Sequence, residues 1–330
     1  MAQPSFAPDR YSKAPYRRCG SSGLVLPPVS LGFWQNLGRP GNEDLCRQCC
    51  YWAFDNGVNH FDLANNYGPP PGNSELVVGR ILKDMPRDEL IISTKAGYEM
   101  WPGPYGDGGS RKYLLASLDQ SLKRLGLDYV DIFYHHRPDA EVDLAESMSA
   151  MDQAVRHGKA IYAGISNYPG AKTRDAAVTV RQRGWAPITI HQPRINMLDR
   201  KLITDLLPVT DELGIGVIAF SPLAGGRLTD RYLAGLPEGS RLAGSDHGRQ
   251  RYEADKAAGT FAKVAKLGEL AKARGQTTAQ LALTWLLSDR RITSALVGVS
   301  SLAQLKECLG AAAAATLTAD ELKHIDAVLA

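Results

Sequence analysis

Eight short apolar runs, separated by stretches of helical length, are the feature of this sequence that most restricts its fold. They cover residues 29–33, 59–64, 89–95, 129–135, 160–166, 188–192, 216–221 and 294–298. Continuous apolar runs are typical of strands buried on both faces, and therefore of a parallel sheet. Eight such units favour a closed (β/α)8 TIM barrel over an open doubly wound sheet. The open alternative also lacks its usual G-x-G-x-x-G loop after the first strand.

The stretches between these runs have the periodicity of helices with one buried face. In Arg111–Leu125, leucines recur with the i, i+3, i+4 spacing of a single apolar stripe. Similar stretches cover 42–56, 144–157 and 170–183. Most of them are followed by a glycine, the residue that most readily ends a helix in left-handed backbone.

Three segments fall outside this alternation. Residues 1–15 are rich in proline and serine, and we expect them to form a flexible tail. Two short runs at 16–19 and 24–27 flank the turn sequence GSSG and predict a β-hairpin. Residues 221–258 hold many Gly, Arg and Asp residues with little periodicity, which predicts a long functional loop after the seventh strand. No linker divides 16–330, which we expect to be a single (β/α)8 domain.

Composition excludes several classes of protein. Hydrophobic residues make up 44% and charged residues 22% of the chain, close to the values of soluble globular proteins. The net charge of +3 is too balanced for a general nucleic-acid binder. No stretch approaches the roughly 18 consecutive apolar residues that cross a membrane, and the N-terminal residues lack the apolar segment of a secretory signal. The five cysteines fit the cytoplasm better than a disulfide scaffold.

Polar side chains stand at the ends of the apolar runs. Asp62, Lys95 and His136 each come at or just after the last residue of a run, about one β-α unit apart. The carboxyl ends of the strands of a barrel meet on one face, and that face carries the chemistry. Charged groups at the ends of buried strands need partners. We therefore expect these side chains to converge and to be one another's partners.

Tyr67, five residues after Asp62, completes a set suited to acid catalysis. A free phenol has a pKa of about 10 and is a poor acid at neutral pH. We expect the Lys95 ammonium to lower this pKa, Asp62 to hold Lys95 protonated, and His136 to donate a hydrogen bond to a substrate oxygen. Such a set can protonate a developing alkoxide while hydride arrives from elsewhere. The alternative is a buried Asp–Lys pair that only fills the barrel.

Seven motifs, in this order and spacing, resemble those of the aldo-keto reductases, (β/α)8 enzymes that reduce carbonyls with NADPH. They are HFDLANNYG (60–68), STKAG (93–97), DIFYHHR (131–137), GISNY (164–168), HQPRIN (191–196), FSPLAGG (220–226) and VGVSSLAQL (297–305). The resemblance covers about residues 16–328. It points to the branch that contains the bacterial L-glyceraldehyde-3-phosphate reductases and the β subunits of potassium channels. The resemblance to the former is stronger, through segments such as FDLANNYGPPPG and MWPGPYG.

The resemblance implies a catalytic tetrad of Asp62, Tyr67, Lys95 and His136. His136 is preferred to its neighbour because it stands five residues after Asp131. For the cofactor NADPH the implied residues are Phe33, Trp34, Asp62, Ser166, Asn167, Gln192, Phe220, Ser221, Pro222, Leu223, Ala224, Gly226, Arg231, Arg241, Gly298, Ser300, Gln304 and Glu307. For the substrate they are Trp34, Tyr67, Trp101, His136 and Arg137. No metal site is expected.

Together these features predict an NADPH-dependent reductase of small aldehydes, such as L-glyceraldehyde 3-phosphate and methylglyoxal, with Tyr67 as the general acid. One alternative is a regulatory subunit that binds NADPH for a partner protein and has little turnover. Another is a dehydrogenase that works mainly in the oxidising direction. We expect a cytoplasmic homo-oligomer, a tetramer or octamer, with no nucleic-acid or membrane partner.

Three positions depart from the family pattern. Cys308 stands where the family often has an Asn that contacts adenine, and Ser301 stands where a Lys or Arg often follows the phosphate-binding serine. The preference for NADPH over NADH then rests mainly on Arg241. Ile195 replaces a common Tyr, which affects the expected shape of the pocket but leaves the tetrad intact.

Two further signals allow more than one interpretation. The spacing Cys46-x-x-Cys49-Cys50 resembles a redox or metal motif, but no second cysteine pair accompanies it, so we expect ordinary packing. Arg137 and Arg194 either hold a substrate phosphate or form surface salt bridges.

Overall fold

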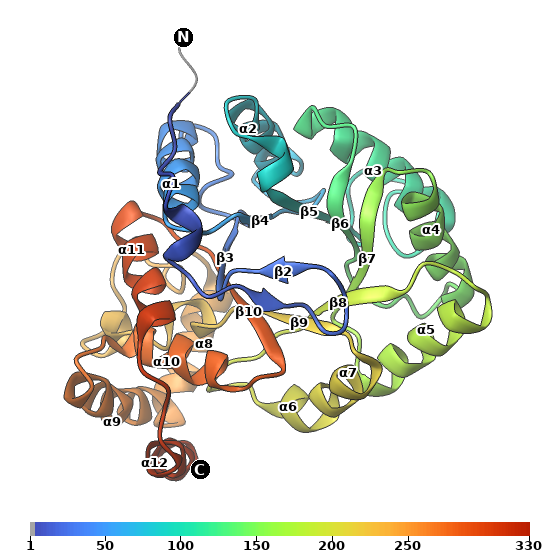
Figure 1. Cartoon of the computed structure of the whole chain (residues 1–330). Coiled ribbons are helices and arrows are strands. Elements are labelled where there is room, and N and C mark those ends of the chain that lie inside the picture. Colours follow the sequence, from blue (N-terminus) through green and yellow to red (C-terminus); the bar gives the residue numbers. More distant parts are fainter. Residues whose placement is uncertain (1–3) are drawn as a thin grey trace.

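The computed structural model describes residues 4–330. Eight parallel strands form a closed barrel, confirming the predicted (β/α)8 fold (Figure 1). In chain order they are β3 (Val29–Gly32), β4 (His60–Asp62), β5 (Ile91–Ala96), β6 (Val130–His135), β7 (Ala160–Ser166), β8 (Ile188–Gln192), β9 (Gly216–Phe220) and β10 (Ile292–Val297), and β10 pairs with β3 to close the ring. Each predicted apolar run overlaps one of these strands.

Helices surround the barrel on the outside (Figure 1). They are α1 (Glu43–Asp55), α2 (Asn73–Leu82), α3 (Arg111–Leu125), α4 (Leu144–Arg156), α5 (Gly170–Gln182), α6 (Lys201–Asp205), α7 (Leu207–Leu213), α8 (Asp246–Ala257), α9 (Thr260–Ala273), α10 (Thr278–Ser288), α11 (Leu302–Gly310) and α12 (Ala319–Leu329). Five single-turn 3-10 segments accompany them within residues 4–330, namely η1 (Arg10–Ser12), η2 (Arg87–Glu89), η3 (Ala224–Gly226), η4 (Asp230–Tyr232) and η5 (Ala311–Ala313).

Local sequence explains where the helices begin and end, as α3 illustrates. The Ser110 side chain accepts a hydrogen bond from the amide of Tyr113 and caps the first turn. Gly126 has φ 67°, and its amide donates to the carbonyl of Leu122. Only glycine takes this left-handed conformation without strain, so the helix ends there.

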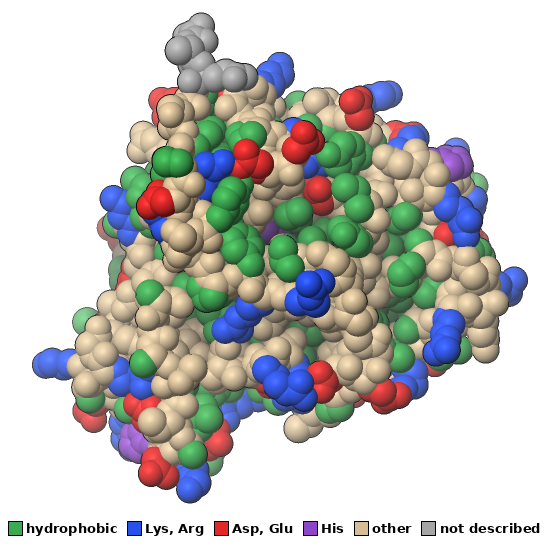
Figure 2. Space-filling model, in the orientation of Figure 1, with side chains coloured by type: hydrophobic (Ala, Val, Ile, Leu, Met, Phe, Trp, Pro, Cys, Tyr) green, Lys and Arg blue, Asp and Glu red, His purple; other side chains and the backbone are tan. Residues whose placement is uncertain are grey.

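The predicted hairpin closes one end of the barrel. Strand β1 (Arg17–Arg18) pairs antiparallel with β2 (Val25–Leu26), and the pair crosses the end of the barrel that faces the viewer in Figure 1. Leu24 and Leu26 pack against side chains from inside the barrel, and the amide of Ser21 donates to the carbonyl of Gly214 just before β9. On this face of the molecule, basic and acidic side chains are interspersed (Figure 2).

The described part of the segment expected to be a flexible tail, residues 4–15, lies against α1. Phe6 makes edge-on contacts with the rings of Tyr51 and Phe54. The amide of Ala7 donates to Asp55 at 2.7 Å. These contacts give the segment a defined path, which its proline-rich composition did not indicate.

Buried side chains pack both outside and inside the ring of strands, and the two sides of the barrel interior differ in polarity. The larger hydrophobic core fills the space between the strands and the surrounding helices. Inside the barrel, one side is lined by hydrophobic residues, here called the interior apolar cluster: Ile132, Tyr134, Ile190, Ile218 and Leu296. The other side holds buried polar residues, here called the interior polar network: Ser30, His60, Asp62, Ser93, Lys95 and Ser294.

The segment 221–258 is the long connection predicted after the seventh barrel strand, but it is not irregular throughout. It contains η3, η4 and the twelve-residue helix α8, which Ser245 caps by accepting from the amide of Gly248. No periodic pattern marks α8 because the helix has few buried residues, among them Tyr252 and Asp255. Arg227 forms a buried ion pair with Asp255 at 3.0 Å, which ties α8 to the start of the segment.

Candidate active site

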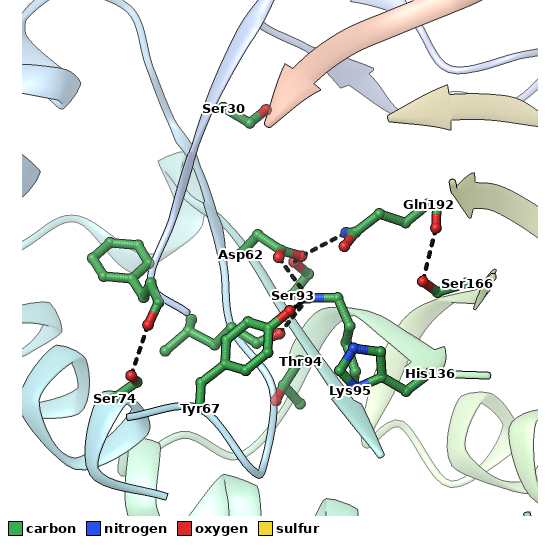
Figure 3. A network of polar contacts seen from close by, with 12 residues as sticks. Ser30, Asp62, Tyr67, Ser74, Ser93, Thr94, Lys95, His136, Ser166 and Gln192 are labelled. Carbon is green, nitrogen blue, oxygen red and sulfur yellow. Dashed lines mark hydrogen bonds and ion pairs between the residues drawn. The ribbon is translucent and has the colours of Figure 1, made fainter. Parts of the chain in front are cut away.

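Asp62 lies at the end of β4 and is the centre of a buried hydrogen-bond network (Figure 3). Its Oδ2 accepts from Lys95 Nζ at 2.5 Å, and its Oδ1 accepts from Ser93 Oγ at 2.7 Å and from Gln192 Nε2 at 2.9 Å. Gln192 reaches Asp62 from β8, on the opposite side of the barrel. The polar ends of distant strands therefore converge at one mouth of the barrel, as the sequence predicted.

Lys95 links Asp62 to Tyr67. Its ammonium donates to Asp62, to the carbonyl of Leu63 at 2.7 Å and to the hydroxyl of Tyr67 at 3.3 Å. An ammonium has three hydrogens, so each now has an acceptor. Tyr67 receives a hydrogen bond from Lys95 and therefore keeps its own hydroxyl hydrogen free for another acceptor. This geometry suits a phenol that gives its proton to a substrate oxygen.

The direction of the Tyr67 pKa differs from the expectation. Burial, followed by the negative charge of Asp62, raises the pKa of Tyr67 well above its usual value. Burial also lowers the pKa of Lys95, although Asp62 opposes this change. The expected lowering of the Tyr67 pKa was wrong because it considered the ammonium and neglected burial of the phenol and the carboxylate beside it. The consequence is that Tyr67 is a neutral phenol at neutral pH and carries the proton that a general acid needs.

His136 follows β6 and faces Tyr67 with its ring tilted at 70°, at a centroid distance of 5.8 Å. The ring is also edge-on to Tyr98, at 4.7 Å. Burial, together with the positive charge of Lys95, lowers the pKa of His136 well below its usual value. The imidazole is therefore neutral and has one N–H to donate. The neighbouring His135 turns away and contacts the Tyr168 hydroxyl through Nδ1 at 2.6 Å.

Three predicted cofactor residues form a group beside the tetrad. Ser166 Oγ donates to the carbonyl of Gln192 at 2.7 Å (Figure 3). The side chain of Asn167 donates to the carbonyl of His136 at 3.0 Å and to Ser166 Oγ at 3.1 Å. The group thus connects the ends of β6, β7 and β8.

Backbone strain also coincides with the predicted cofactor residues. Within residues 4–330, the residues other than glycine with positive φ are Asn167, Ser221 and Ala224, at 59°, 52° and 51°. All three belong to the predicted cofactor set. Strained backbone of this kind persists where the surrounding fold enforces it and is concentrated at ligand sites. Phe220, at the end of β9, immediately precedes the second strained position, and Pro222, Leu223 and Gly226 complete this turn.

A group of arginines near the mouth carries positive charge without a paired carboxylate. In the described chain, neither Arg231 nor Arg241 has a carboxylate within 4.0 Å. The Arg241 guanidinium lies over the Trp34 ring, 5.2 Å from its centroid. Desolvation lowers the pKa of Arg241, and repulsion from Arg39 and Arg231 lowers it further. Such unpaired guanidinium groups suit a phosphate-bearing ligand.

The residues predicted to hold the adenosine end lie after β10. Gln304 Oε1 accepts from the amide of Ser300 at 2.9 Å and from its hydroxyl at 3.0 Å. Gly298 is exposed, and Glu307 lies on α11 with its carbonyl bonded to Gln280. The start of α11 is capped by Ser301. The strained turn, the unpaired arginines and the Ser166–Gln192 group together fit a dinucleotide with several phosphates.

The predicted substrate residues are less closely grouped. Trp34 is 49% exposed at the mouth, and the Trp101 ring packs on Tyr113 at 5.2 Å. Arg137 is bound to Asp107 at 2.9 Å and to the carbonyl of Gly97 at 2.7 Å. A second arginine, Arg194, pairs with Asp199 at 3.2 Å. Both arginines form the surface salt bridges that were the alternative to holding a phosphate.

The sequence analysis missed two residues of the site. Ser93 donates to Asp62, and Tyr98 contacts both His136 and Arg137. Ser93 stands two residues before Lys95, and side chains at i and i+2 of a strand share a face. That spacing was a signal that could have identified it.

Within the described residues, no group of three His, Cys, Asp or Glu side chains is placed to hold a metal ion. The three cysteines of α1 are buried and unbonded to one another by disulfides. No helix of residues 4–330 is both long and apolar enough to span a bilayer.

A parallel (β/α)8 barrel with this Asp–Lys–Tyr–His cluster at its mouth agrees with comparison to known proteins. The Aldo/keto reductase family matches residues 28–330, and the chain belongs to this family. It is an oxidoreductase, and members of the family use nicotinamide cofactors.

Individual relatives refine this assignment. The chain is 49% identical to the L-glyceraldehyde 3-phosphate reductase of Escherichia coli (strain K12), across 97% of this chain and 93% of the relative. It is 35% identical to a putative voltage-gated potassium channel subunit beta of Schizosaccharomyces pombe, with 96% and 93% of the chains covered. A probable channel subunit beta of Arabidopsis thaliana is 33% identical, with coverages of 88% and 89%.

Proposed function

We propose that this protein reduces small aldehydes to alcohols with NADPH, and that Tyr67 is the general acid. L-Glyceraldehyde 3-phosphate is the first substrate to test, because of the 49% identity to a reductase of that name. Methylglyoxal, a small α-oxo aldehyde, is the second. The observation that carries the proposal is the Tyr67 hydroxyl, which accepts from Lys95 and keeps its own proton free.

The residues around Tyr67 have separate tasks in this proposal. When bound, NADPH supplies the hydride that adds to the carbonyl carbon. Tyr67 gives its hydroxyl proton to the carbonyl oxygen, and Lys95 stabilises the phenolate that remains. Asp62 keeps Lys95 charged and in place. The neutral His136 donates its N–H to the same carbonyl oxygen and orients the aldehyde.

The test follows the absorbance of NADPH with L-glyceraldehyde 3-phosphate and with methylglyoxal, for the wild type and for Tyr67→Phe. The variant keeps the ring and removes only the proton donor. We expect its turnover to fall by at least about 100-fold, the usual contribution of a general acid. Equal turnover of the two proteins would contradict the role of Tyr67, and no turnover of any aldehyde by the wild type would contradict the function.

The preference for NADPH over NADH is proposed to depend on Arg231 and Arg241. We expect Arg241→Ala to raise the KM for NADPH and to leave the KM for NADH nearly unchanged. Arg249→Ala is a matched control, because Arg249 lies in the same segment and already pairs with Asp246 at 2.8 Å. An equal change for both cofactors would show that Arg241 does not select between them.

The second candidate is an NADPH-binding regulatory subunit, favoured by the 35% and 33% identity to proteins named as channel subunits. It predicts tight NADPH binding with negligible turnover, so the assay above separates the two. We further propose a cytoplasmic location and a homo-oligomer, a tetramer or octamer. Analytical ultracentrifugation of the purified chain tests the oligomeric state.

A further inference from the structure

A continuous row of buried side chains leads away from Asp62 into the barrel. Ser93 Oγ, which donates to Asp62, lies 3.1 Å from His60 Nε2. On the other side of the ring, His60 Nδ1 lies 2.9 Å from Ser30 Oγ, which lies 2.7 Å from Ser294 Oγ. Each of these side chains is fully buried. Four strands contribute to the row, which we call the serine–histidine chain: Ser294, Ser30, His60 and Ser93.

The Asp62 carboxylate fixes the direction of every hydrogen bond in this chain. The Lys95 ammonium, 2.5 Å from Asp62 Oδ2, favours an ionised Asp62 carboxylate, which can only accept hydrogen bonds. Ser93 has one hydroxyl hydrogen and gives it to Asp62, so it must accept from His60. His60 therefore carries its hydrogen on Nε2.

The same argument continues on the far side of the ring. With its hydrogen on Nε2, a neutral His60 has a lone pair on Nδ1, and Ser30 must donate to it. Ser30 has then used its hydrogen and accepts from Ser294. All four donors consequently point toward Asp62.

Burial keeps the His60 ring neutral. It lowers the pKa of His60 to about 4, although Asp62 raises this pKa, and Lys95 lowers it further. The hydrogen-bond partners of the ring are the serine hydroxyls of β3 and β5, which carry no charge. Tyr67 contacts Lys95 and makes no hydrogen bond to the His60 ring.

We propose that the serine–histidine chain positions Asp62 and polarises it for proton donation at Tyr67, with His60 as a positioning residue. This inference rests on the proposed role of Tyr67. Four aligned donors favour the negative charge on Asp62 and thereby lower the proton affinity of the linked Asp62–Lys95–Tyr67 group. Removing donors makes this group hold its proton more tightly. The high-pH limb of the kcat profile, where kcat falls because the group loses its proton, therefore moves to higher pH.

The direction of the hydrogen bonds in the serine–histidine chain can be measured without any turnover. In protein labelled with nitrogen-15 at histidine, the ring-nitrogen shifts distinguish the two neutral tautomers from the charged ring, and a His60→Asn variant assigns the His60 signals. We expect His60 to be neutral with its proton on Nε2 between pH 5.5 and 8. A proton on Nδ1, or a charged ring in this range, overturns the proposal.

Two serine variants test whether Asp62 sets this direction. Ser30→Ala leaves Ser93 as the acceptor, so His60 keeps its proton on Nε2. Ser93→Ala removes that acceptor, so the proton moves to Nδ1 and Ser30 becomes the acceptor. If His60 had the same tautomer in both variants, Asp62 would not set the direction of the hydrogen bonds in the serine–histidine chain.

The pH profile of kcat tests the link to catalysis. We expect Ser93→Ala to move the high-pH limb upward by about one pH unit, the effect of losing one hydrogen bond to a charged group. The shift should be smaller for Ser30→Ala and smallest for Ser294→Ala, because the break lies farther from Asp62. Ser121→Ala is the control, since Ser121 is also buried but lies on α3 and contacts Arg124.

The outcomes separate a positioning role from a purely structural one. Ser93→Ala could lower stability and leave the high-pH limb of kcat where the wild type has it. In that case the serine–histidine chain only fills the barrel, and the proposal fails. If the wild type reduces no aldehyde, the proposed function fails, while the tautomer measurement still decides whether the chain points toward Asp62.

Discussion

The two sides of the barrel interior differ in chemistry although they share one fold. The interior polar network comes from β10, β3, β4 and β5, and the interior apolar cluster comes mainly from β6, β8 and β9. Leu296 and Ser294 show the division within a single strand, because both lie on β10. Barrel interiors are usually filled by layers of branched apolar side chains. Here that rule holds on one side and gives way to serines, a histidine and an ion pair on the other.

This difference indicates how a barrel accommodates charge. The apolar side excludes water and lowers the local dielectric constant, which strengthens each interaction of the polar side. Every donor that points at Asp62 comes from a strand, so the geometry is fixed by the barrel itself. Changes on the polar side are thus expected to alter both reactivity and stability, whereas changes on the apolar side should alter stability alone.

The largest effect is expected from Lys95→Met, which removes the charge at the centre of the interior polar network. Asp62 would lose its ion-pair partner in a fully buried site, a loss of about 3 to 5 kcal/mol in the free energy of unfolding. Turnover should fall at least about 100-fold. Urea denaturation and the aldehyde assay measure the two effects. The double variant Asp62→Asn/Lys95→Met should recover part of the stability and none of the turnover; recovery of turnover would contradict the role of the pair.

On the apolar side, Ile218→Ala is expected to reduce stability without altering the chemistry. Ile218 is fully buried, and removing three carbons there should lower the free energy of unfolding by about 3 kcal/mol. The high-pH limb of kcat should stay where the wild type has it when measured well below the melting temperature. A displaced limb would show that the two sides are not independent.

Acid should destabilise the protein through buried histidines on three of the barrel strands, β4, β6 and β8. Burial lowers the pKa of His60 and of His135 to about 4, and that of His191 to about 3. The unfolded chain takes up these protons below about pH 6.5, whereas the folded chain does so only near its lowered pKa values. The free energy of unfolding should therefore fall by up to about 1.4 kcal/mol per pH unit for each histidine between those limits. Urea denaturation at pH 7.5 and 5.5 measures this; equal stability would contradict neutral buried histidines.

The smallest effect is expected from Ile190→Val, which removes one methylene from the interior apolar cluster. The free energy of unfolding should fall by about 1 kcal/mol, with turnover and its pH profile unchanged. Thermal unfolding followed by circular dichroism measures the loss. A change in the pH profile from so small a cavity would mean that the reacting groups depend on packing as well as on hydrogen bonds.

The strands and the convergence of Asp62, Lys95 and His136 were predictable because both depend on local pattern. A run of buried residues identifies a strand, and the barrel brings every strand end to one mouth. Helix α8 was not predictable in the same way, since it buries few of its residues and has no apolar stripe. The segment containing it is held by the distant pair Arg227–Asp255.

Properties that depend on several distant groups were beyond the sequence. The direction of the Tyr67 pKa follows from burial and the Asp62 carboxylate together. The pairing of Arg137 with Asp107 joins residues 30 positions apart. The tautomer of His60 follows only from the full row of contacts between Ser294 and Asp62.

The hairpin β1–β2 gives the barrel a floor, with Leu24 and Leu26 sealed against the apolar side chains within. Side chains fill the barrel above this floor, so the hairpin end offers no path to the catalytic side chains. A ligand therefore approaches Tyr67 from the opposite end of the barrel, where the strands finish.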